Sequence, residues 1–411
     1  MHTLHSAPVV LAMGTRPEII KMAPVALCLQ RLGVPVRILH TGQHDEEMAL
    51  PLYRFFGLVP HASLTLERRQ PGLAALSAEL LDIITAQLTD WRPSAVLVHG
   101  DTSSAAMAAL AAFYQRIPVG HVEAGLRSGQ IYEPFPEEMN RRLIGQLATW
   151  HFAPTARAVS NLRREGLEEG VFEVGNTVVD AVRWADARLR RMAEEGAPLD
   201  VPALDWFART GCSRLVLVTA HRRENWEAMR QIASAVNDIL LAEPGLAVVW
   251  PLHPNPAVQQ AVRTVHDAVP EAVRRRWLLV APQDYPSMVS LMVHSDVLLS
   301  DSGGVQEEGA SLHRPVLVLR NVTERPELIS SGAGRLVGTD RRQVAAHTLE
   351  LLRDAAARQR MQTPVNPFGD GQTGQRIARL VAQGVRRGGA VPPQAAEPPA
   401  APRSVPSVLP A

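Results

Sequence analysis

Residues 296–308 read DVLLSDSGGVQEE, in which an apolar run is followed by two glycines and two glutamates. The apolar run predicts a buried strand, and the glycines predict a turn into a helix. Gly303 and Gly304 leave the backbone amides open to an anion, and the helix start adds unpaired N–H groups and the positive end of its dipole. The segment therefore favours a phosphate site, although two glycines after a strand also fit a plain tight turn.

The rest of the chain repeats this alternation of short apolar runs and amphipathic stretches. The runs are rich in Val, Ile and Leu, and each ends at a Gly, Thr, Asn or charged residue or close to one. They cover residues 7–14, 34–42, 94–100, 117–125, 148–155 and 171–176, and then residues 214–221, 246–254, 276–282, 296–304 and 315–320. Such alternation is typical of parallel sheets with helices on both faces. The sequence predicts an α/β fold with two doubly wound domains.

A charge-rich helical segment separates the two series of strands, so we place the domain boundary near residue 178. The predicted domains are residues 1–178 and residues 179–370. A helical stretch at residues 371–387 is expected to cross back to the first domain. Residues 388–411 are rich in Pro and Ala, cannot bury a core and predict a disordered tail.

Composition argues against several classes of function. In the 411 residues, 42 Lys and Arg nearly balance 41 Asp and Glu, which gives no indication of a nucleic-acid or anionic-membrane partner. Cys28 and Cys212 have neither metal-ligand nor redox spacing, so they indicate a reducing compartment without a zinc site or disulfide. No apolar stretch reaches roughly 18 residues and the N-terminus has no signal-peptide pattern. We expect a cytoplasmic protein without a membrane span.

Basic residues follow the first predicted strand, in GTRPEIIKMAP at residues 14–24. Thr15 can cap the next helix and Pro17 suits its first turn, so Arg16 and Lys21 would lie near the carboxyl edge of the sheet. Arg325, in NVTERPE, follows a strand of the second domain and would lie at the same edge. Together these cations suit a nucleotide diphosphate. For any single one of them, a solvated side chain on a helix face is the simpler interpretation.

Acidic residues follow the glycines and several strands. A helix N-terminus favours negative charge, which explains one of Glu307 and Glu308; the other could accept hydrogen bonds from the two hydroxyls of a ribose. In the first domain the acidic residues at strand ends or in loops are Asp101, Glu123 and Glu137. Asp101 would also fit as a helix N-cap. Glu123 interrupts an apolar run between glycines, and a buried carboxylate there needs a partner or a task.

Two histidines end strands of the second domain. His221 lies in VTAHRREN with Arg222 and Arg223 beside it, and His253 lies in PLHPNP. A single histidine is more often structural than functional. His221 would nevertheless face the cleft between the domains, because it ends a strand at the carboxyl edge.

These motifs, read together and in order, carry a resemblance. GTRPEIIKMAP, TGQH, VHGDTSSAAMAALAAFYQRIPVGHVEAGLRSG, PFPEEMNRR, VGNTVVDA, TAHRREN and SDSGGVQEE with TERPE resemble the bacterial non-hydrolysing UDP-N-acetylglucosamine 2-epimerase family over about residues 9–380. The resemblance implies two Rossmann-like domains in the glycosyltransferase-B arrangement, with a cleft between them, and a homodimer. It also implies interconversion of UDP-N-acetylglucosamine and UDP-N-acetylmannosamine without a metal or any other cofactor.

The site residues implied by the resemblance fall into two sets. The catalytic set is Asp101, Glu123, Glu137 and His221. The UDP-binding set is Arg16, Lys21, Gln283, Ser302, Gly303, Gly304, Glu308 and Arg325. Within the second set, the diglycine turn with Ser302 would hold the phosphates, Glu308 the ribose, and Gln283 would lie near the uracil.

Some family members bind a second UDP-N-acetylglucosamine as an activator. The residues that resemble that site are Gln43, His44, Arg69 and His253. The chain departs from the family at residues 45–48, where DEEM replaces a frequent Arg and adds charge that disfavours an anion. Met288 also stands where an aromatic residue is common, which would weaken stacking on uracil but not a backbone contact.

The chemistry explains why such residues are needed. The hydrogen at C2 of the sugar is barely acidic, but loss of UDP from C1 would acidify it, giving 2-acetamidoglucal beside bound UDP. Re-addition of UDP at C1, with the proton returned to C2 from the opposite face, gives the epimer and needs acid/base groups on both faces. Two alternatives stay open: the hydrolysing relative, which releases UDP and N-acetylmannosamine, and a UDP-sugar glycosyltransferase or binding protein on the same fold.

Overall fold

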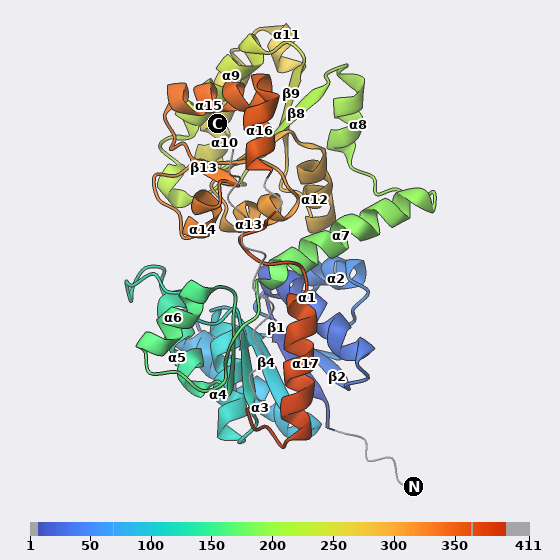
Figure 1. Cartoon of the computed structure of the whole chain (residues 1–411), viewed down its shortest axis with the longest axis vertical. Coiled ribbons are helices and arrows are strands. Elements are labelled where there is room, and N and C mark those ends of the chain that lie inside the picture. Colours follow the sequence, from blue (N-terminus) through green and yellow to red (C-terminus); the bar gives the residue numbers. More distant parts are fainter. Residues whose placement is uncertain (1–6, 69, 363–364, 392–411) are drawn as a thin grey trace, which may run out of the picture.

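Two parallel sheets, one above the other along the long axis, organise the computed structural model of the protein (Figure 1). It describes residues 7–68, 70–362 and 365–391. The first sheet has the strand order β3-β2-β1-β4-β5-β6-β7, and the second has the order β10-β9-β8-β11-β12-β13. All strand pairs within both sheets are parallel. This confirms the predicted α/β class with two Rossmann-like, doubly wound units.

Eleven strands lie within the predicted apolar runs, whereas β3 and β13 were not predicted. The strands are β1 (Val9–Met13), β2 (Val36–His40), β3 (Ala62–Ser63), β4 (Ala95–His99), β5 (Val119–Val122), β6 (Trp150–Ala153), β7 (Val171–Glu173), β8 (Arg214–Thr219), β9 (Leu246–Pro251), β10 (Trp277–Val280), β11 (Val297–Ser300), β12 (Val316–Val318) and β13 (Gly334–Leu336). The α-helices are α1 (Arg16–Arg31), α2 (Glu46–Phe55), α3 (Leu73–Trp91), α4 (Ser103–Tyr114), α5 (Glu137–Leu147), α6 (Ala156–Arg164), α7 (Thr177–Glu194), α8 (Pro202–Arg209), α9 (Met229–Ala242), α10 (Pro256–His266), α11 (Glu271–Arg274), α12 (Tyr285–His294), α13 (Gly303–Ser311), α14 (Pro326–Ser330), α15 (Arg341–Arg353), α16 (Ala355–Met361) and α17 (Thr373–Arg386). One short 3-10 helix covers Arg223–Asn225.

The central strands are buried along their whole length. Every residue of β1 and β4 is buried, because helices cover both faces of the sheet. In register, Val9 of β1 lies between Val36 of β2 and Ala95 of β4. Burial on both faces accounts for the continuous apolar runs of these segments.

The strand order reverses beside β1 in the first sheet and beside β8 in the second. In doubly wound sheets ligands bind beyond the carboxyl ends of the strands at such a switch point. The turns that follow β1 and β4 carry Thr15 and Asp101, and those that follow β8 and β11 carry His221 and Ser302. The fold therefore gathers most of the predicted site residues at the two carboxyl edges.

Two helices connect the units. Helix α7 begins at Thr177, spans the predicted boundary at residue 178, and contacts α1 of the first unit as well as α12 and α13 of the second. Helix α17 lies against α1, far from the preceding helices of the second unit (Figure 1). The Asp180 carboxylate accepts hydrogen bonds from the backbone N–H groups of Thr373 (3.2 Å) and Gly374 (2.9 Å), which fixes the start of α17 on α7.

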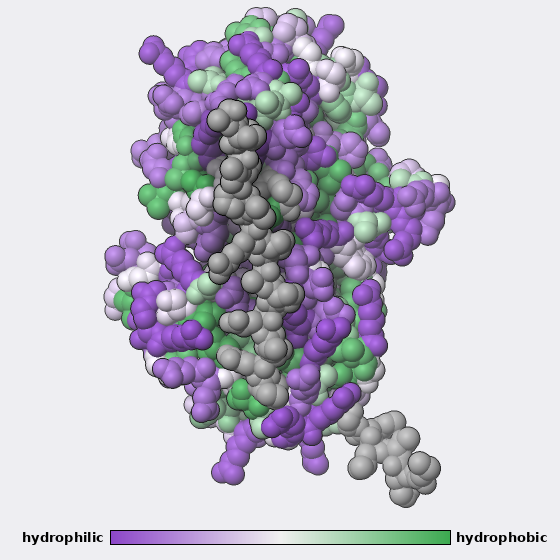
Figure 2. All heavy atoms as spheres, in the orientation of Figure 1, coloured by the Kyte–Doolittle hydropathy of each residue, from purple (hydrophilic) through white to green (hydrophobic). Residues whose placement is uncertain are grey.

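Apolar side chains lie mainly inside. The face shown in Figure 2 is largely hydrophilic, with separate hydrophobic patches between hydrophilic residues. Within the described residues, we find no helix that is both long and apolar enough to span a membrane. The predicted tail overlaps the described residues only at 388–391, and its remainder, 392–411, lies outside them.

Candidate active site

The central feature of the site is a chain of buried charges that links the two units. Lys21 of α1 contacts the Glu123 carboxylate with its Nζ, which also lies 3.3 Å from Oε2 of Glu307 in α13. Glu307 accepts a hydrogen bond of 2.9 Å from Nε of Arg325. The side chains of Lys21 and Glu123 are each 10% exposed and that of Glu307 is 3% exposed. This series of ion pairs therefore joins the carboxyl edge of the first sheet to that of the second.

Glu123 has an unusual backbone. It directly follows β5 and has a φ of +65°, a left-handed backbone conformation that residues other than glycine rarely adopt. Its Oε2 lies 3.7 Å from Nε2 of the buried His99. Burial opposes ionisation of Glu123, but Lys21 and His99 outweigh it and lower its pKa to about 2. Glu123 is thus an ionised carboxylate held at the sheet edge.

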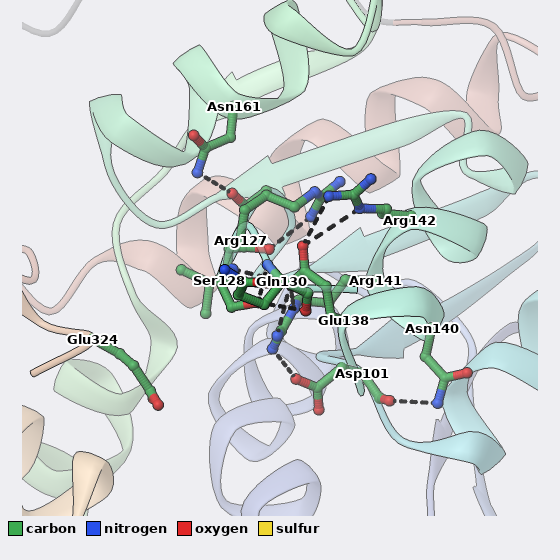
Figure 3. Close-up of polar contacts among 12 residues, drawn as sticks. Asp101, Arg127, Ser128, Gln130, Glu138, Asn140, Arg141, Arg142, Asn161 and Glu324 are labelled. Carbon is green, nitrogen blue, oxygen red and sulfur yellow. Dashed lines mark hydrogen bonds and ion pairs between the residues drawn. The ribbon is translucent and has the colours of Figure 1, made fainter. Parts of the chain in front are cut away.

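Asp101 lies in a different electrostatic environment. Burial raises its pKa to about 6, since the nearby Arg141 offsets only part of that effect and Glu123 and Glu137 add to it. The N-cap of α4 is Thr102, whose side chain accepts from the backbone N–H of Ala105, so the N-cap interpretation of Asp101 is wrong. The Asp101 side chain instead accepts from Arg141 (Figure 3).

The diglycine turn is shaped around Arg325. A helix follows β11 as predicted: α13 begins at Gly303 and has Ser302 at its N-cap. A Cβ added to Gly303 would lie 3.2 Å from Cζ of Arg325, so the missing side chain makes room for that guanidinium. A Cβ at Gly304 would meet only the Ser302 hydroxyl, at 3.9 Å.

The two glutamates of this helix differ from the prediction. Neither lies in the first turn of α13, so pairing with the helix end does not explain Glu307. Glu307 pairs with Lys21 and Arg325 instead. Glu308 is half-buried; burial and the adjacent Glu307 raise its pKa to about 8, against the opposing charges of Lys21 and Arg16.

His221 belongs to a separate cluster in the second unit. Its Nδ1 lies 3.4 Å from the fully buried Asp301, which also accepts from the backbone N–H groups of His221 and Arg222 and from the Asn225 side chain. Burial lowers the pKa of His221, with Asp301 opposing that effect. The rings of His221 and His253 stack at 6.4 Å. The structure thus brings Asp101, Glu123 and Glu137 together, whereas the charged neighbours of His221 belong to the second unit.

Three of the remaining predicted residues, Gln43, His44 and Gln283, have neighbours other than the ion pairs described above. Gln43 accepts from the backbone N–H of Ser104 at 3.0 Å, and burial together with Arg16 lowers the pKa of His44. Gln283 donates to the carbonyl of Ala281, just before α12. Arg69 lies outside the described residues, and the described part of the chain has no group of three or more His, Cys, Asp or Glu that could hold a metal ion.

Sequence reasoning missed several buried polar residues of the site. They are Glu18, His99, Glu138, Arg141 and Asp301. Glu18 accepts from the backbone N–H groups of Gly14 (2.8 Å) and Thr15 (2.7 Å) and so holds the turn after β1. The pairing of Glu138 with Arg141 could have been predicted from the sequence, because residues three positions apart lie on one face of a helix.

Comparison with known proteins identifies the family. The family model described as UDP-N-acetylglucosamine 2-epimerase matches residues 28–382. The chain belongs to the UDP-N-acetylglucosamine 2-epimerase family. Within this family it is similar to the UDP-N-acetylglucosamine 2-epimerase of Salmonella typhimurium, with 42% identity over 376 residues that cover 91% of this chain and 98% of the relative.

Two solved structures of epimerase chains agree with this assignment. A putative UDP-N-acetylglucosamine 2-epimerase from Listeria monocytogenes has a TM-score of 0.83 and 35% identity, covering 93% of this chain and 97% of its own. The UDP-GlcNAc 2-epimerase from Neisseria meningitidis, bound to UDP-GlcNAc, has a TM-score of 0.81 and 37% identity, covering 91% of this chain and 99% of its own. The family predicted from the sequence motifs is therefore confirmed.

Proposed function

We propose that the protein is a non-hydrolysing epimerase that interconverts UDP-N-acetylglucosamine and UDP-N-acetylmannosamine by inverting C2 of the sugar. The observation that carries this proposal is the largely buried series of ion pairs Glu123–Lys21–Glu307–Arg325, with Asp101, whose pKa is higher than that of Glu123, beside it. A relative named UDP-N-acetylglucosamine 2-epimerase matches 91% of the chain, and a similar solved structure is bound to UDP-GlcNAc. Both support this substrate.

In this proposal the second unit binds UDP. Ser302, Gly303 and Gly304 present backbone amides at the start of α13 to the diphosphate, where the helix dipole favours an anion. Arg325 and Arg16 add positive charge. Glu308 binds the ribose; with a pKa of about 8 it is mostly protonated at neutral pH and so can both donate and accept hydrogen bonds.

The carboxylates of the first unit would then face the sugar. As the C1–O bond breaks, its electron pair leaves with the diphosphate and positive charge develops at C1. Glu123 has a pKa of about 2 and is therefore ionised at neutral pH, so its negative charge suits stabilisation of the positive charge at C1. Asp101, with a pKa of about 6, is better suited to take the C2 proton or return it, because proton transfer is most efficient when the pKa lies near the working pH.

Re-addition completes the reaction. A proton reaches C2 from the opposite face while the UDP oxygen attacks C1, so product and substrate have the same composition and the C2 hydrogen can come from solvent. Glu137 lies close enough to raise the pKa of Asp101 and is the candidate for the second face. His221, oriented through Nδ1 by Asp301, is the candidate acid toward the departing phosphate.

Proton NMR in D2O tests this function. The purified protein is mixed with UDP-N-acetylglucosamine, without acceptor or metal. Appearance of UDP-N-acetylmannosamine with deuterium at C2 is the expected result. Free N-acetylmannosamine plus UDP would mean the hydrolysing reaction, and an unchanged spectrum from folded, UDP-binding protein would favour a transferase or binding protein.

The proposal extends to assembly and use. We infer a homodimer and a product that supplies surface-polysaccharide synthesis; sedimentation at equilibrium tests the first part. Activation by a second UDP-N-acetylglucosamine would involve Gln43, His44, Arg69 and His253. It would appear as a sigmoidal dependence of rate on substrate, and the acidic DEEM segment acts against it.

A further inference from the structure

We propose that Arg141 is the positioning residue for Asp101, and that the buried Glu138 holds Arg141 in place for this task. The inference rests on the proposed function, in which Asp101 transfers a proton at C2. It adds two residues of α5 that do not touch the reacting atoms but determine where the Asp101 carboxylate points and when it is charged.

The geometry is that of a guanidinium shared between two carboxylates (Figure 3). Nη1 of Arg141 lies 2.5 Å from Oδ2 of Asp101, while Nε and Nη2 lie 3.2 Å and 3.0 Å from Oε2 of Glu138. The guanidinium is planar, so two bonds to Glu138 fix the direction of the third N–H group. That direction is toward Asp101.

Glu138 is built as an anchor. Its side chain is fully buried, and its Oε2 also accepts from the backbone N–H of Ser128 at 3.0 Å. Its other oxygen, Oε1, faces Arg142 at 3.3 Å. Oε2 of this buried carboxylate accepts from three N–H groups, two of Arg141 and one of Ser128, and cannot turn away without leaving them unpaired, so the Arg141 side chain has a rigid support.

Helix α5 also fixes the Asp101 backbone. The Asn140 side chain donates to the Asp101 carbonyl at 2.8 Å. One turn of α5 therefore controls both the backbone and the carboxylate of a residue 40 positions earlier in the chain. An ion pair that served stability alone would not require this second restraint.

The charges around Asp101 give Arg141 a measurable effect. Asp101 faces Arg141 and Glu137 from α5, Glu123 from the turn after β5, and Lys21 from α1. Burial and the two glutamates raise its pKa, and Arg141 is the largest influence in the other direction. Removal of an adjacent Arg raises a carboxyl pKa by roughly 1–3 units. Arg141 thus keeps Asp101 mostly ionised at neutral pH, where without Arg141 about half or more of it would be protonated.

The test compares variants of two neighbouring arginines in the full-length protein. Arg141→Gln removes the bridge. Arg142→Gln is the matched control, because Arg142 is 40% exposed and contacts Glu138 only at its other oxygen, Oε1, which holds neither Arg141 nor Asp101. Rates of epimerisation of UDP-N-acetylglucosamine are measured by NMR across pH 5–9, with KM and kcat separated.

We expect Arg141→Gln to lower kcat by ~10²-fold with KM changed by less than about threefold, as for a misplaced catalytic group. The limb of the pH–rate profile that Asp101 controls should move to higher pH by roughly 1–2 units, whether Asp101 acts as base or as acid. Arg142→Gln should stay within about threefold of wild type. Guanidinium ion added to Arg141→Ala should restore part of the rate.

A second variant separates position from charge. Glu138→Gln keeps the Arg141 charge but loosens its support, so kcat should fall without an upward shift of the limb. If Arg141→Gln does not fold, as judged by UDP binding and thermal unfolding, Glu138→Gln and Arg141→Lys decide instead; both should lower kcat more than KM rises.

The inference fails if Arg141→Gln and Arg142→Gln have equal kcat values and unmoved limbs. It also fails if the only loss in Glu138→Gln or Arg141→Lys is thermal stability. Wild-type protein that binds UDP but epimerises nothing would instead overturn the proposed function, so the two failures are distinguishable.

Discussion

Lys21→Met should destabilise the protein strongly. Lys21 is the only lysine among the 42 Lys and Arg residues of the chain, and it is buried between Glu123 and Glu307. Removing one partner of a buried ion pair costs about 3–5 kcal/mol, because the remaining charge loses its compensation. The lowered pKa of Glu123, about 2 instead of 4.5, has the same sign, because Lys21 is the strongest of the charges that oppose the effect of burial. We expect the free energy of unfolding at pH 7 to fall by about 3–5 kcal/mol.

The pH dependence provides the sign. In wild type the lowered pKa of Glu123 contributes stability above pH 4.5, and this contribution is lost as the pH falls toward 2. Without Lys21, burial should raise the pKa of Glu123 above its usual value, so the carboxylate becomes less destabilising as it is protonated. The deficit of the variant relative to wild type should therefore shrink as the pH falls from 7 to 5.

Urea unfolding followed by circular dichroism at several pH values measures this deficit. The double variant Lys21→Met/Glu123→Gln is the control, because the neutral amide removes one unpaired charge and should recover part of the loss. A deficit below about 1 kcal/mol, the range of exposed pairs, or one that does not change with pH, would refute the buried-pair reasoning.

Two further predictions concern α13. Gly303→Ala should weaken UDP binding by about tenfold in calorimetry, because a Cβ 3.2 Å from Cζ of Arg325 displaces the guanidinium. Gly304→Ala should lose less affinity, because only the Ser302 hydroxyl lies near its Cβ. Equal losses of affinity in the two variants would contradict this account. Glu308 has a raised pKa, so its contribution to stability is present below pH 4.5 and is lost as the pH rises through about 8. Glu308→Gln should flatten the decline of stability between pH 5 and 9, and an unchanged slope in urea unfolding would count against the raised pKa.

The order of strands and helices could be predicted from the sequence because a strand buried on both faces must be apolar throughout. The same reasoning located the polar residues after β1, β4, β5 and β11, since parallel strands bring their carboxyl ends to one edge. Asp101 and Glu123 were found in this way. Glu307 was misread, because its position near a helix start suggested the dipole as partner and nothing local indicates an Arg or Lys.

Hydrophobic pattern and turn chemistry act between neighbours in the chain, so the sequence by itself determined the α/β class, the family and the turns that carry the site. The tertiary structure decided which charges meet: Lys21 with Glu123 and Glu307, and Arg141 with Asp101. These partners come from separate elements, and their contacts depend on how the two units lie against each other and on where α5 lies relative to the turn after β4. Burial and these charged neighbours then determine the protonation of each carboxylate, so Glu123 and Asp101, both carboxylic acids, have pKa values of about 2 and about 6.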